Sequence, residues 1–314
     1  MTSPALPTGG LVAVAVTPLV DTSAVDVPSI TTLMEFYLAC GASGVALLGV
    51  MGEANRMTDV EAETVVGHAA EAIGGRIPII VGVSSSSLAR VEALGHFAME
   101  QGCAGVMLQP LAGLQGDRTV AAYFKAAAQA LGVDVPICVQ DFPKANGVHI
   151  SVDCWRMIVE DCPSVVALKH EDEPGLAKLS ALRAAEEDGV RPVTIFTGNN
   201  GIHLPQELAR GGDGSMTGFA FPDVLATVIA LSEEGSTDQA EDLFDQYLPV
   251  NRHELRLGIA VRKEILRRRG AIAGAAARYP STALDPIATE ELDRLLERLE
   301  HSTGRAITDI RAPR

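Results

Sequence analysis

Val165-Val166-Ala167-Leu168-Lys169 is a short apolar stretch that ends in a lysine. A lysine at the end of a buried strand is costly unless it has a function, because desolvation disfavours an ammonium. A neutral lysine amine can attack a ketone, and Schiff-base enzymes make their nucleophile in this way. The alternative is a side chain that simply emerges into water where the strand ends.

Similar apolar runs recur along the chain, separated by segments with helical periodicity. The runs are rich in Val, Ile and Leu and nearly continuous, which is typical of parallel strands buried on both faces. The predicted strands are residues 11–16, 44–48, 78–83, 105–108, 136–139, 165–169, 193–196 and 214–216. The clearest predicted helices are residues 59–73, 87–101, 119–131, 152–160, 175–187 and 222–231.

Eight strand–helix units in sequence predict an α/β fold, a (β/α)8 TIM barrel. A doubly wound open sheet is the alternative, but it predicts a glycine-rich turn after the first strand, where Val16-Thr17-Pro18-Leu19 stands instead. We assign residues 1–232 to the barrel and residues 233–314 to a C-terminal helical extension. Its predicted helices, 238–247, 255–269 and 289–301, exceed what a minimal barrel needs and either cap the barrel or form an oligomer contact.

The composition narrows the classes of function. Of the 314 residues 47% are hydrophobic, enough for a large core, and the formal net charge of −15 argues against a nucleic-acid partner. The five cysteines form no C-x-x-C pair, so neither a disulfide framework nor a zinc cluster is indicated. No basic segment followed by an apolar one begins the chain, and no apolar stretch is long enough to cross a bilayer. We expect a soluble, cytoplasmic protein with no membrane partner.

Barrel enzymes carry their catalytic residues at the C-terminal ends of the strands, so the residues that follow each run matter most. Side chains alternate along a strand, which places Ala167, Lys169 and Glu171 on one face and Leu168 and His170 on the other. If Lys169 faces the barrel axis, Glu171 stands above it at the mouth. Glu171 could shuttle protons there, or it could be an ion-pair partner that hinders attack by the amine.

Six short motifs follow the order of a known family over roughly residues 10–280. Thr17-Pro18-Leu19 resembles its Thr-Pro-Phe, Gly49-Val50-Met51-Gly52-Glu53 its Gly-Thr-Thr-Gly-Glu, and Gln140-Asp141-Phe142-Pro143 its Tyr-Asn-x-Pro. Leu168-Lys169 resembles the strand that carries the family's Schiff-base lysine. Residues 211–217 resemble the family's Gly-x-x-Gly-x-Ile-Ser, and Arg278-Tyr279-Pro280 resembles its Arg-x-Pro. The chain thus resembles the dihydrodipicolinate synthase / N-acetylneuraminate lyase family of class I aldolase-type barrels, and Lys169 becomes the expected Schiff-base lysine.

The departures from that family concern its hydroxyl groups. The Thr–Tyr–Tyr relay that moves protons in the family reads Val50, Gln140 and, at the subunit-lent tyrosine, Pro110-Leu111-Ala112. The paired threonines that hold the keto-acid carboxylate read Val50-Met51, so only backbone N–H groups remain. The arginine that binds the second carboxylate in the synthases falls near Lys144-Ala145. These changes argue against true dihydrodipicolinate synthase activity, and some keto-deoxy sugar acid dehydratases of the family carry similar Gln-Asp-x-Pro and Lys-x-Glu patterns.

We therefore predict a Schiff-base lyase that acts on a 2-keto acid, such as a keto-deoxy sugar acid or a pyruvate-derived compound. Loss of a 4-hydroxyl would make it a dehydratase, and cleavage of the C3–C4 bond an aldolase. The predicted catalytic residues are Lys169, Glu171 as general acid/base, and Gln140. The predicted substrate-binding residues are Val50, Met51, Gly52, Asp141, Asn199 and Thr217. No metal or organic cofactor is expected, and the family likeness suggests a homodimer or homotetramer.

Two other classes of protein stay open on sequence grounds. A catalytically silent keto-acid sensor or scaffold would keep the fold without the reaction. A barrel enzyme for phosphorylated substrates would need a glycine-rich cradle after the last two strands. Gly198 and Gly211-Gly212 supply glycines there, but the neighbouring Asp213 repels phosphate. The polar residues that crowd the predicted strand ends favour the lyase.

Overall fold

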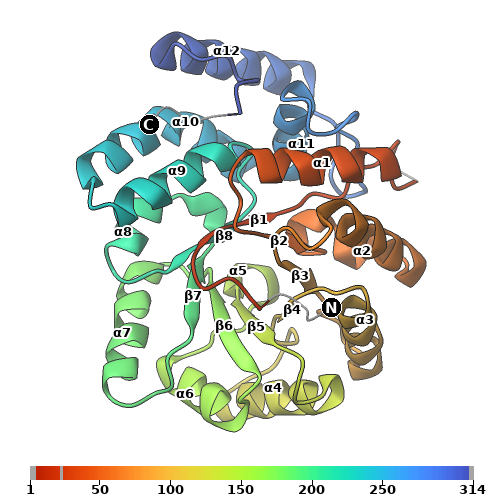
Figure 1. The fold of residues 1–314 in the computed structure, drawn as a ribbon, viewed down its shortest axis with the longest axis vertical. Helices are drawn as coiled ribbons and strands as arrows, with labels where there is room; N and C mark the ends of the chain where they lie inside the picture. The colour runs from red at the N-terminus through yellow and green to blue at the C-terminus, as the bar shows by residue number, and fades with distance from the viewer. Residues whose placement is uncertain (1–4, 22–23, 311–314) are drawn as a thin grey trace.

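The computed structural model describes residues 5–21 and 24–310 and contains a closed barrel of eight parallel strands (Figure 1). The strands are β1 Gly10–Val14, β2 Gly44–Leu47, β3 Ile79–Gly82, β4 Gly105–Leu108, β5 Ile137–Asp141, β6 Val165–His170, β7 Thr194–Thr197 and β8 Gly214–Thr217. They pair in chain order, and β1 also pairs with β8, so the sheet has no free edge. The (β/α)8 prediction is confirmed. The ends of the two predicted units, 1–4 and 311–314, lie outside the described residues.

The strands form because their side chains are buried on both faces. Side chains from all eight strands fill the inside of the barrel. This interior cluster includes Val12, Ala46, Ile80, Met107, Cys138, Ala167, Phe196 and Met216, each at most 1% exposed. It forms a packed core rather than a pore. Lys169 lies two residues beyond Ala167, nearer the C-terminal end of β6, where it pairs in register with Phe196 of β7.

Helices surround the barrel on the outside. They are α1 Val27–Ala39, α2 Asp59–Ile73, α3 Leu88–Glu100, α4 Asp117–Leu131, α6 Val152–Asp161, α7 Gly175–Glu187, α8 Leu204–Leu208 and α9 Pro222–Glu233. Four short elements lie in loops: η1 Val50–Gly52, η2 Ala54–Arg56, α5 Pro143–Asn146 and η3 Asn199–Gly201. The start of α2 is fixed by a capping box, in which the Thr58 and Glu61 side chains each bind the other residue's backbone N–H.

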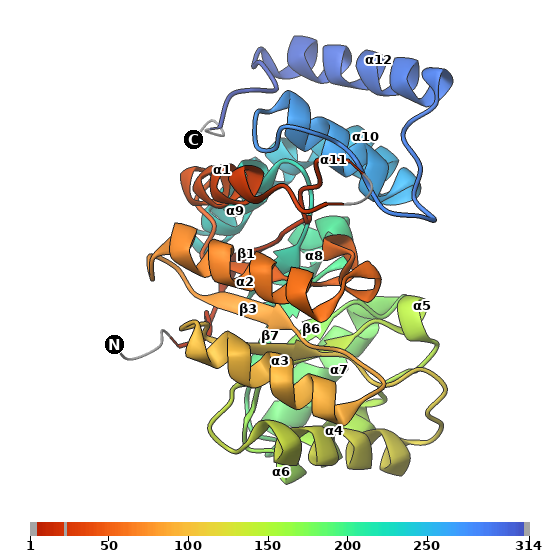
Figure 2. The ribbon, with the colours of Figure 1, turned by 90° about the vertical axis from the view of Figure 1, so that its right-hand side faces the viewer.

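The extension consists of α10 Thr237–Leu257, α11 Ile259–Arg268 and α12 Pro286–Thr303. Two predicted boundaries were wrong. The helix expected over 238–247 continues through Pro249 to Leu257, and the helix expected over 255–269 begins only at Ile259, after a break at Gly258. Gly258 has a positive φ of 75°, which glycine adopts at little cost. Burial of the α10 side chains Phe244, Tyr247 and Val250 outweighs the backbone hydrogen bond lost at the proline. In Figures 1 and 2, α12 lies outermost, beyond α10 and α11.

Arg269, the residue after α11, joins the extension to the barrel helices. Its guanidinium lies 5.1 Å from the ring centre of Phe36 and 4.5 Å from that of Phe221. It also pairs with the Asp223 carboxylate at 2.9 Å, and its side chain is fully buried. Cation–π contacts are strongest where the cation is desolvated, so this arginine fixes the extension against α1 and α9. No helix in the described ranges is both long and apolar enough to span a membrane.

Candidate active site

Lys169 and Glu171 lie together at the end of β6. Lys169 Nζ is 3.1 Å from Glu171 Oε2, and the two side chains are 5% and 8% exposed. The alternation of side chains along the strand predicts that both point the same way, and this contact agrees with that prediction. A carboxylate at this distance can accept the proton that the ammonium must lose before it attacks a carbonyl group.

Glu171 has other partners besides the lysine. Gln140 Nε2 donates a hydrogen bond to Glu171 Oε2 at 2.6 Å, and the Asn199 backbone N–H donates to Oε1 at 3.3 Å. Asn199 Nδ2 also donates to the backbone oxygen of Glu171 at 3.1 Å. The carboxylate is therefore held by groups from β5 and η3, and it keeps these hydrogen bonds if Lys169 becomes an imine. A simple ion pair would have no such support.

Gly198 makes room for this carboxylate, and the sequence reasoning did not identify that role. A Cβ on Gly198 would lie 2.3 Å from Glu171 Cγ and 2.4 Å from Oε1, far inside van der Waals contact. The next two residues, Asn199 and Asn200, have positive φ angles of 48° and 63°, which asparagine tolerates better than most residues. The Gly-Asn-Asn sequence after β7 is the signal that could have indicated this tight turn.

Asp141 is not brought together with these residues. Gln140 precedes it on β5 and faces Glu171, so Asp141 points to the outer side of the strand. Its Oδ2 lies 2.5 Å from Lys178 Nζ of α7 and 3.6 Å from His170 Nδ1. This placement separates Asp141 from the reacting groups, and the structure gives no support to its predicted contact with substrate.

The loop after β2 contains three predicted substrate-binding residues, and only one of them borders the barrel interior. Met51 packs against the cluster of side chains inside the barrel, whereas Val50 is 49% exposed. The backbone N–H of Gly52 donates to the Gly49 oxygen at 2.9 Å, so this amide is already bonded. Thr217, at the end of β8, is buried but follows Met216, whose side chain faces inward, so the alternation directs Thr217 to the other face.

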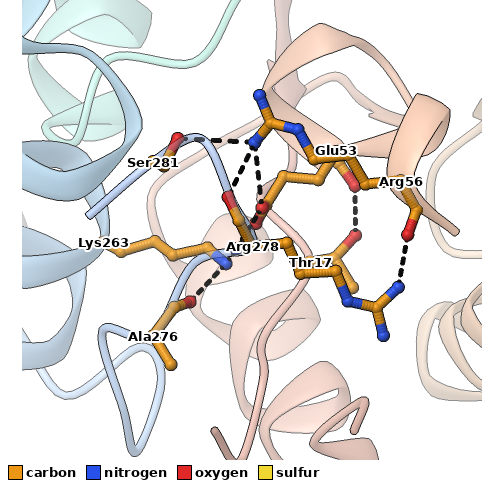
Figure 3. A network of polar contacts seen from close by, with 8 residues as sticks. Thr17, Glu53, Arg56, Lys263, Ala276, Arg278 and Ser281 are labelled. Atoms are coloured by element: carbon orange, nitrogen blue, oxygen red, sulfur yellow. Dashed lines mark hydrogen bonds and ion pairs between the residues drawn. The ribbon is translucent and has the colours of Figure 1, made fainter. Parts of the chain in front are cut away.

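Glu53, which ends this loop, is a structural anchor in a network that Figure 3 shows. It is completely buried, and its carboxylate binds Lys263 Nζ of α11 at 2.6 Å and the Arg278 backbone N–H at 2.7 Å. Burial lowers the pKa of Lys263, while the hydrogen bond that Lys263 donates to Glu53 raises it. Arg56 also pairs with Glu53, at 3.3 Å. The network ties segments separated by about two hundred residues to one loop.

A second buried network braces η3, the turn that carries Asn199. Arg262 of α11 donates from Nε to Glu254 at 2.6 Å and from Nη2 to Asn200 Oδ1. Asn251 Nδ2 donates to the Asn200 oxygen at 2.7 Å. Burial raises the pKa of Glu254, and the Arg262 guanidinium opposes that rise. Both basic side chains that α11 sends toward the barrel, Arg262 and Lys263, are thus neutralised by carboxylates. Within the described ranges no group of three or more potential metal ligands is found.

Comparison with known proteins identifies the family of this chain. Residues 7–299 match the Dihydrodipicolinate synthetase family. The chain belongs to this family. It is 30% identical over 294 residues to an L-2-keto-3-deoxyarabonate dehydratase from Azospirillum brasilense, covering 93% of this chain and 94% of that relative. It is 29% identical over 288 residues to a 4-hydroxy-tetrahydrodipicolinate synthase from Rhizobium meliloti, covering 90% and 96%.

Among solved structures, a dihydrodipicolinate synthase from Rhodopseudomonas palustris superposes with a TM-score of 0.92 at 40% identity, covering 95% of this chain and all of that one. The family predicted from the six motifs is therefore confirmed, and with it the class of enzyme, a lyase.

Proposed function

We propose that this protein is a Schiff-base dehydratase for a 2-keto-3-deoxy sugar acid. The observation that carries the proposal is the buried Glu171 carboxylate, 3.1 Å from Lys169 Nζ and hydrogen-bonded by Gln140. A carboxylate beside the amine takes the place of the family's hydroxyl relay. The Azospirillum brasilense relative, named as a dehydratase of such an acid, supports the same choice.

The reaction begins when Lys169 gives its ammonium proton to Glu171 and attacks the 2-keto carbon of the substrate. Glu171 returns this proton to the carbinolamine hydroxyl, which leaves as water, and the product is a protonated imine whose nitrogen withdraws electrons from C3. Glu171 then removes a C3 proton, and an enamine forms. Glu171 returns that proton to the 4-hydroxyl, which leaves as water while the electron pair of the enamine moves to C3–C4. Hydrolysis of the resulting imine releases the unsaturated keto acid and restores the amine of Lys169.

The residues of the site favour a dehydratase over a synthase. The Rhodopseudomonas palustris structure is named a dihydrodipicolinate synthase, but the residues of the site differ from those of a synthase. In this chain the relay positions read Val50, Gln140 and Pro110-Leu111-Ala112, none of which has a hydroxyl group. The α11 cations Arg262 and Lys263 are bound by buried carboxylates, so neither is available to bind the second carboxylate of a dicarboxylic substrate.

Reductive trapping tests the proposal directly. The protein is incubated with a 2-keto-3-deoxypentonate or with pyruvate and treated with borohydride, and its molecular mass is measured by mass spectrometry. We expect one reduced adduct, which Lys169→Ala abolishes. Glu171→Gln should form the adduct more slowly, because Lys169 loses its proton acceptor, and should lose most dehydration, by about 100-fold, a typical contribution of a general acid/base. The exposed Lys125→Met is the matched lysine control.

Two outcomes of this experiment would contradict the proposal. An unmodified wild-type protein with every keto acid tested would favour a silent keto-acid-binding protein. An adduct accompanied by cleavage of the C3–C4 bond, rather than by loss of water, would identify an aldolase.

The assembly and the compartment belong to the same proposal. The family likeness supports a homodimer or homotetramer, which light scattering coupled to size-exclusion chromatography would measure. All five cysteines are free and buried in the described structure, which supports a reducing compartment such as the cytoplasm.

A further inference from the structure

Lys178, in the first turn of α7, binds two carboxylates on the outer side of the barrel. Its Nζ is 2.5 Å from Asp141 Oδ2 and 2.9 Å from Asp172 Oδ2. The three side chains are 14%, 1% and 15% exposed, so the cluster is largely removed from water. Charge pairs in such surroundings are strongly coupled, and removal of one member leaves the others uncompensated.

The two carboxylates bracket Glu171, which lies on the inner side. Asp172 follows Glu171 in the chain. Asp141 accepts the Glu171 backbone N–H at 2.9 Å through its own backbone oxygen. The Lys178 ammonium therefore holds both Asp141, the β5 residue bonded to the Glu171 backbone, and Asp172, the residue directly after Glu171. A shift in either one would move the Glu171 carboxylate relative to Lys169.

Among the described residues, no second side chain is paired with both Asp141 and Asp172. His170 Nε2 lies 3.0 Å from the Gly175 oxygen, which can only accept, so Nε2 is the donor in this contact. His170 Nδ1 then faces Asp141 Oδ2 at 3.6 Å without a hydrogen bond. Asp141 Oδ1 likewise has no hydrogen-bond partner in the described structure. His149 Nδ1 approaches Asp172 at 3.4 Å, but its side chain is 69% exposed.

We propose that Lys178 is a positioning residue for the reaction, one that sets the placement of the Glu171 carboxylate without contacting substrate. The inference rests on the proposed function, since it concerns the same carboxylate. It assigns catalytic importance to a lysine on an outer helix, behind the strand that carries Lys169. Because a displacement of about 1 Å can cost 100-fold in rate, a modest shift of Glu171 would be measurable.

The test compares Lys178→Met with Lys178→Arg, using a 2-keto-3-deoxypentonate. We expect Lys178→Met to lower kcat by about 10- to 100-fold while KM changes little and borohydride still traps a full adduct on Lys169. Lys178→Arg keeps the charge and should recover most of kcat. Lys125→Met removes a comparable but exposed lysine, paired with Asp161 at 3.2 Å, and should leave kcat unchanged.

An unchanged kcat in a folded Lys178→Met variant would overturn the inference. So would an equal loss of adduct and turnover, which indicates collapse of the whole site. If Lys178→Met does not fold, the Asp172→Asn variant tests the inference instead. It keeps the Lys178–Asp141 pair and weakens only the contact to the residue after Glu171. A wild-type kcat in Asp172→Asn would then overturn the inference. Absence of an adduct in the wild type would instead refute the proposed function, and the role of Lys178 with it.

Discussion

At the scale of single residues, the site is built around one carboxylate with four close neighbours. Lys169, Gln140 and Asn199 bind Glu171, and Gly198 leaves space for it. The ion pair with Lys169 is compatible with catalysis because the same carboxylate can receive the proton that the amine must lose. The other hydrogen bonds keep Glu171 in place after the amine is consumed.

Gly198→Ala should lower kcat for dehydration by roughly 100-fold, because the new Cβ would displace the Glu171 carboxylate. Trapping on Lys169 should persist, since the amine itself is not obstructed. The control is Gly67→Ala in α2, where a Cβ has no neighbour closer than 3.9 Å. Full activity in Gly198→Ala would show that the placement of Glu171 is not critical for turnover.

Glu207 should make stability depend on pH. Burial raises its pKa to about 7, opposed by a hydrogen bond with Thr197 and by nearby His170, while Glu171 raises it further. The unfolded chain releases this proton near the ordinary glutamate pKa of 4.5, whereas the folded protein still binds it, so stability falls as pH rises from about 4.5 to 7. The full effect is roughly 3 kcal/mol.

Glu207→Gln removes this titration. Relative to the wild type, the variant should therefore gain stability between pH 5 and pH 8, as measured by urea unfolding at each pH. A stability difference that does not change with pH would contradict the raised pKa.

At the scale of elements, strand ends and helix starts decide where the functional groups lie. Strand β6 places Lys169 and Glu171 on the barrel side, while α7 sends Lys178 to its outer side. Helix α2 begins at Asp59, directly after the loop that carries Met51 and Glu53, and its capping box fixes where that loop ends.

Thr58→Ala should destabilise the protein by about 1 kcal/mol, because it removes the side chain that accepts the Glu61 backbone N–H. Thr64→Ala, within the same helix, replaces a residue of lower helix propensity and should cost nothing. Urea unfolding of both variants tests this difference. Equal losses would show that the capping box contributes nothing specific.

At the scale of the whole molecule, the extension is packed onto the barrel through buried contacts rather than attached as a separate appendage. Lys263 of α11 reaches Glu53 after β2, Arg262 reaches Asn200 after β7, and Arg269 packs against α1 and α9. The proposed boundary at residue 232 falls at the end of α9, yet these contacts cross it. The mouth of the barrel is therefore shaped by both parts of the chain.

Breaking the buried Glu53–Lys263 pair should be costly. Lys263→Met or Glu53→Gln alone should lower the free energy of unfolding by about 3–5 kcal/mol, because each leaves a charge or its partner unpaired in the core. The double variant should lose less than the sum of the two. Urea unfolding of the four proteins gives the coupling energy, and additive losses would show that the pair is not coupled.

The order of the strands and the pairing of Lys169 with Glu171 could be predicted from the sequence. Both depend on short-range periodicity, which every strand repeats locally. The same alternation could have placed Asp141 on the outer side, because Gln140 precedes it on β5. The end of the helix before Gly258 was missed because side-chain packing, not local propensity, carries α10 through Pro249.

Local patterns along the chain predict a closed barrel with an amine and a carboxylate on one face of its sixth strand. They do not predict that Gln140, Gly198 and Asn199 surround that carboxylate, that Lys178 pairs with the carboxylates behind it, or that Lys263 binds Glu53. The difference comes from distance along the chain. Periodicity fixes which way neighbouring side chains point, whereas contacts between residues tens to hundreds of positions apart depend on how strands close and helices pack.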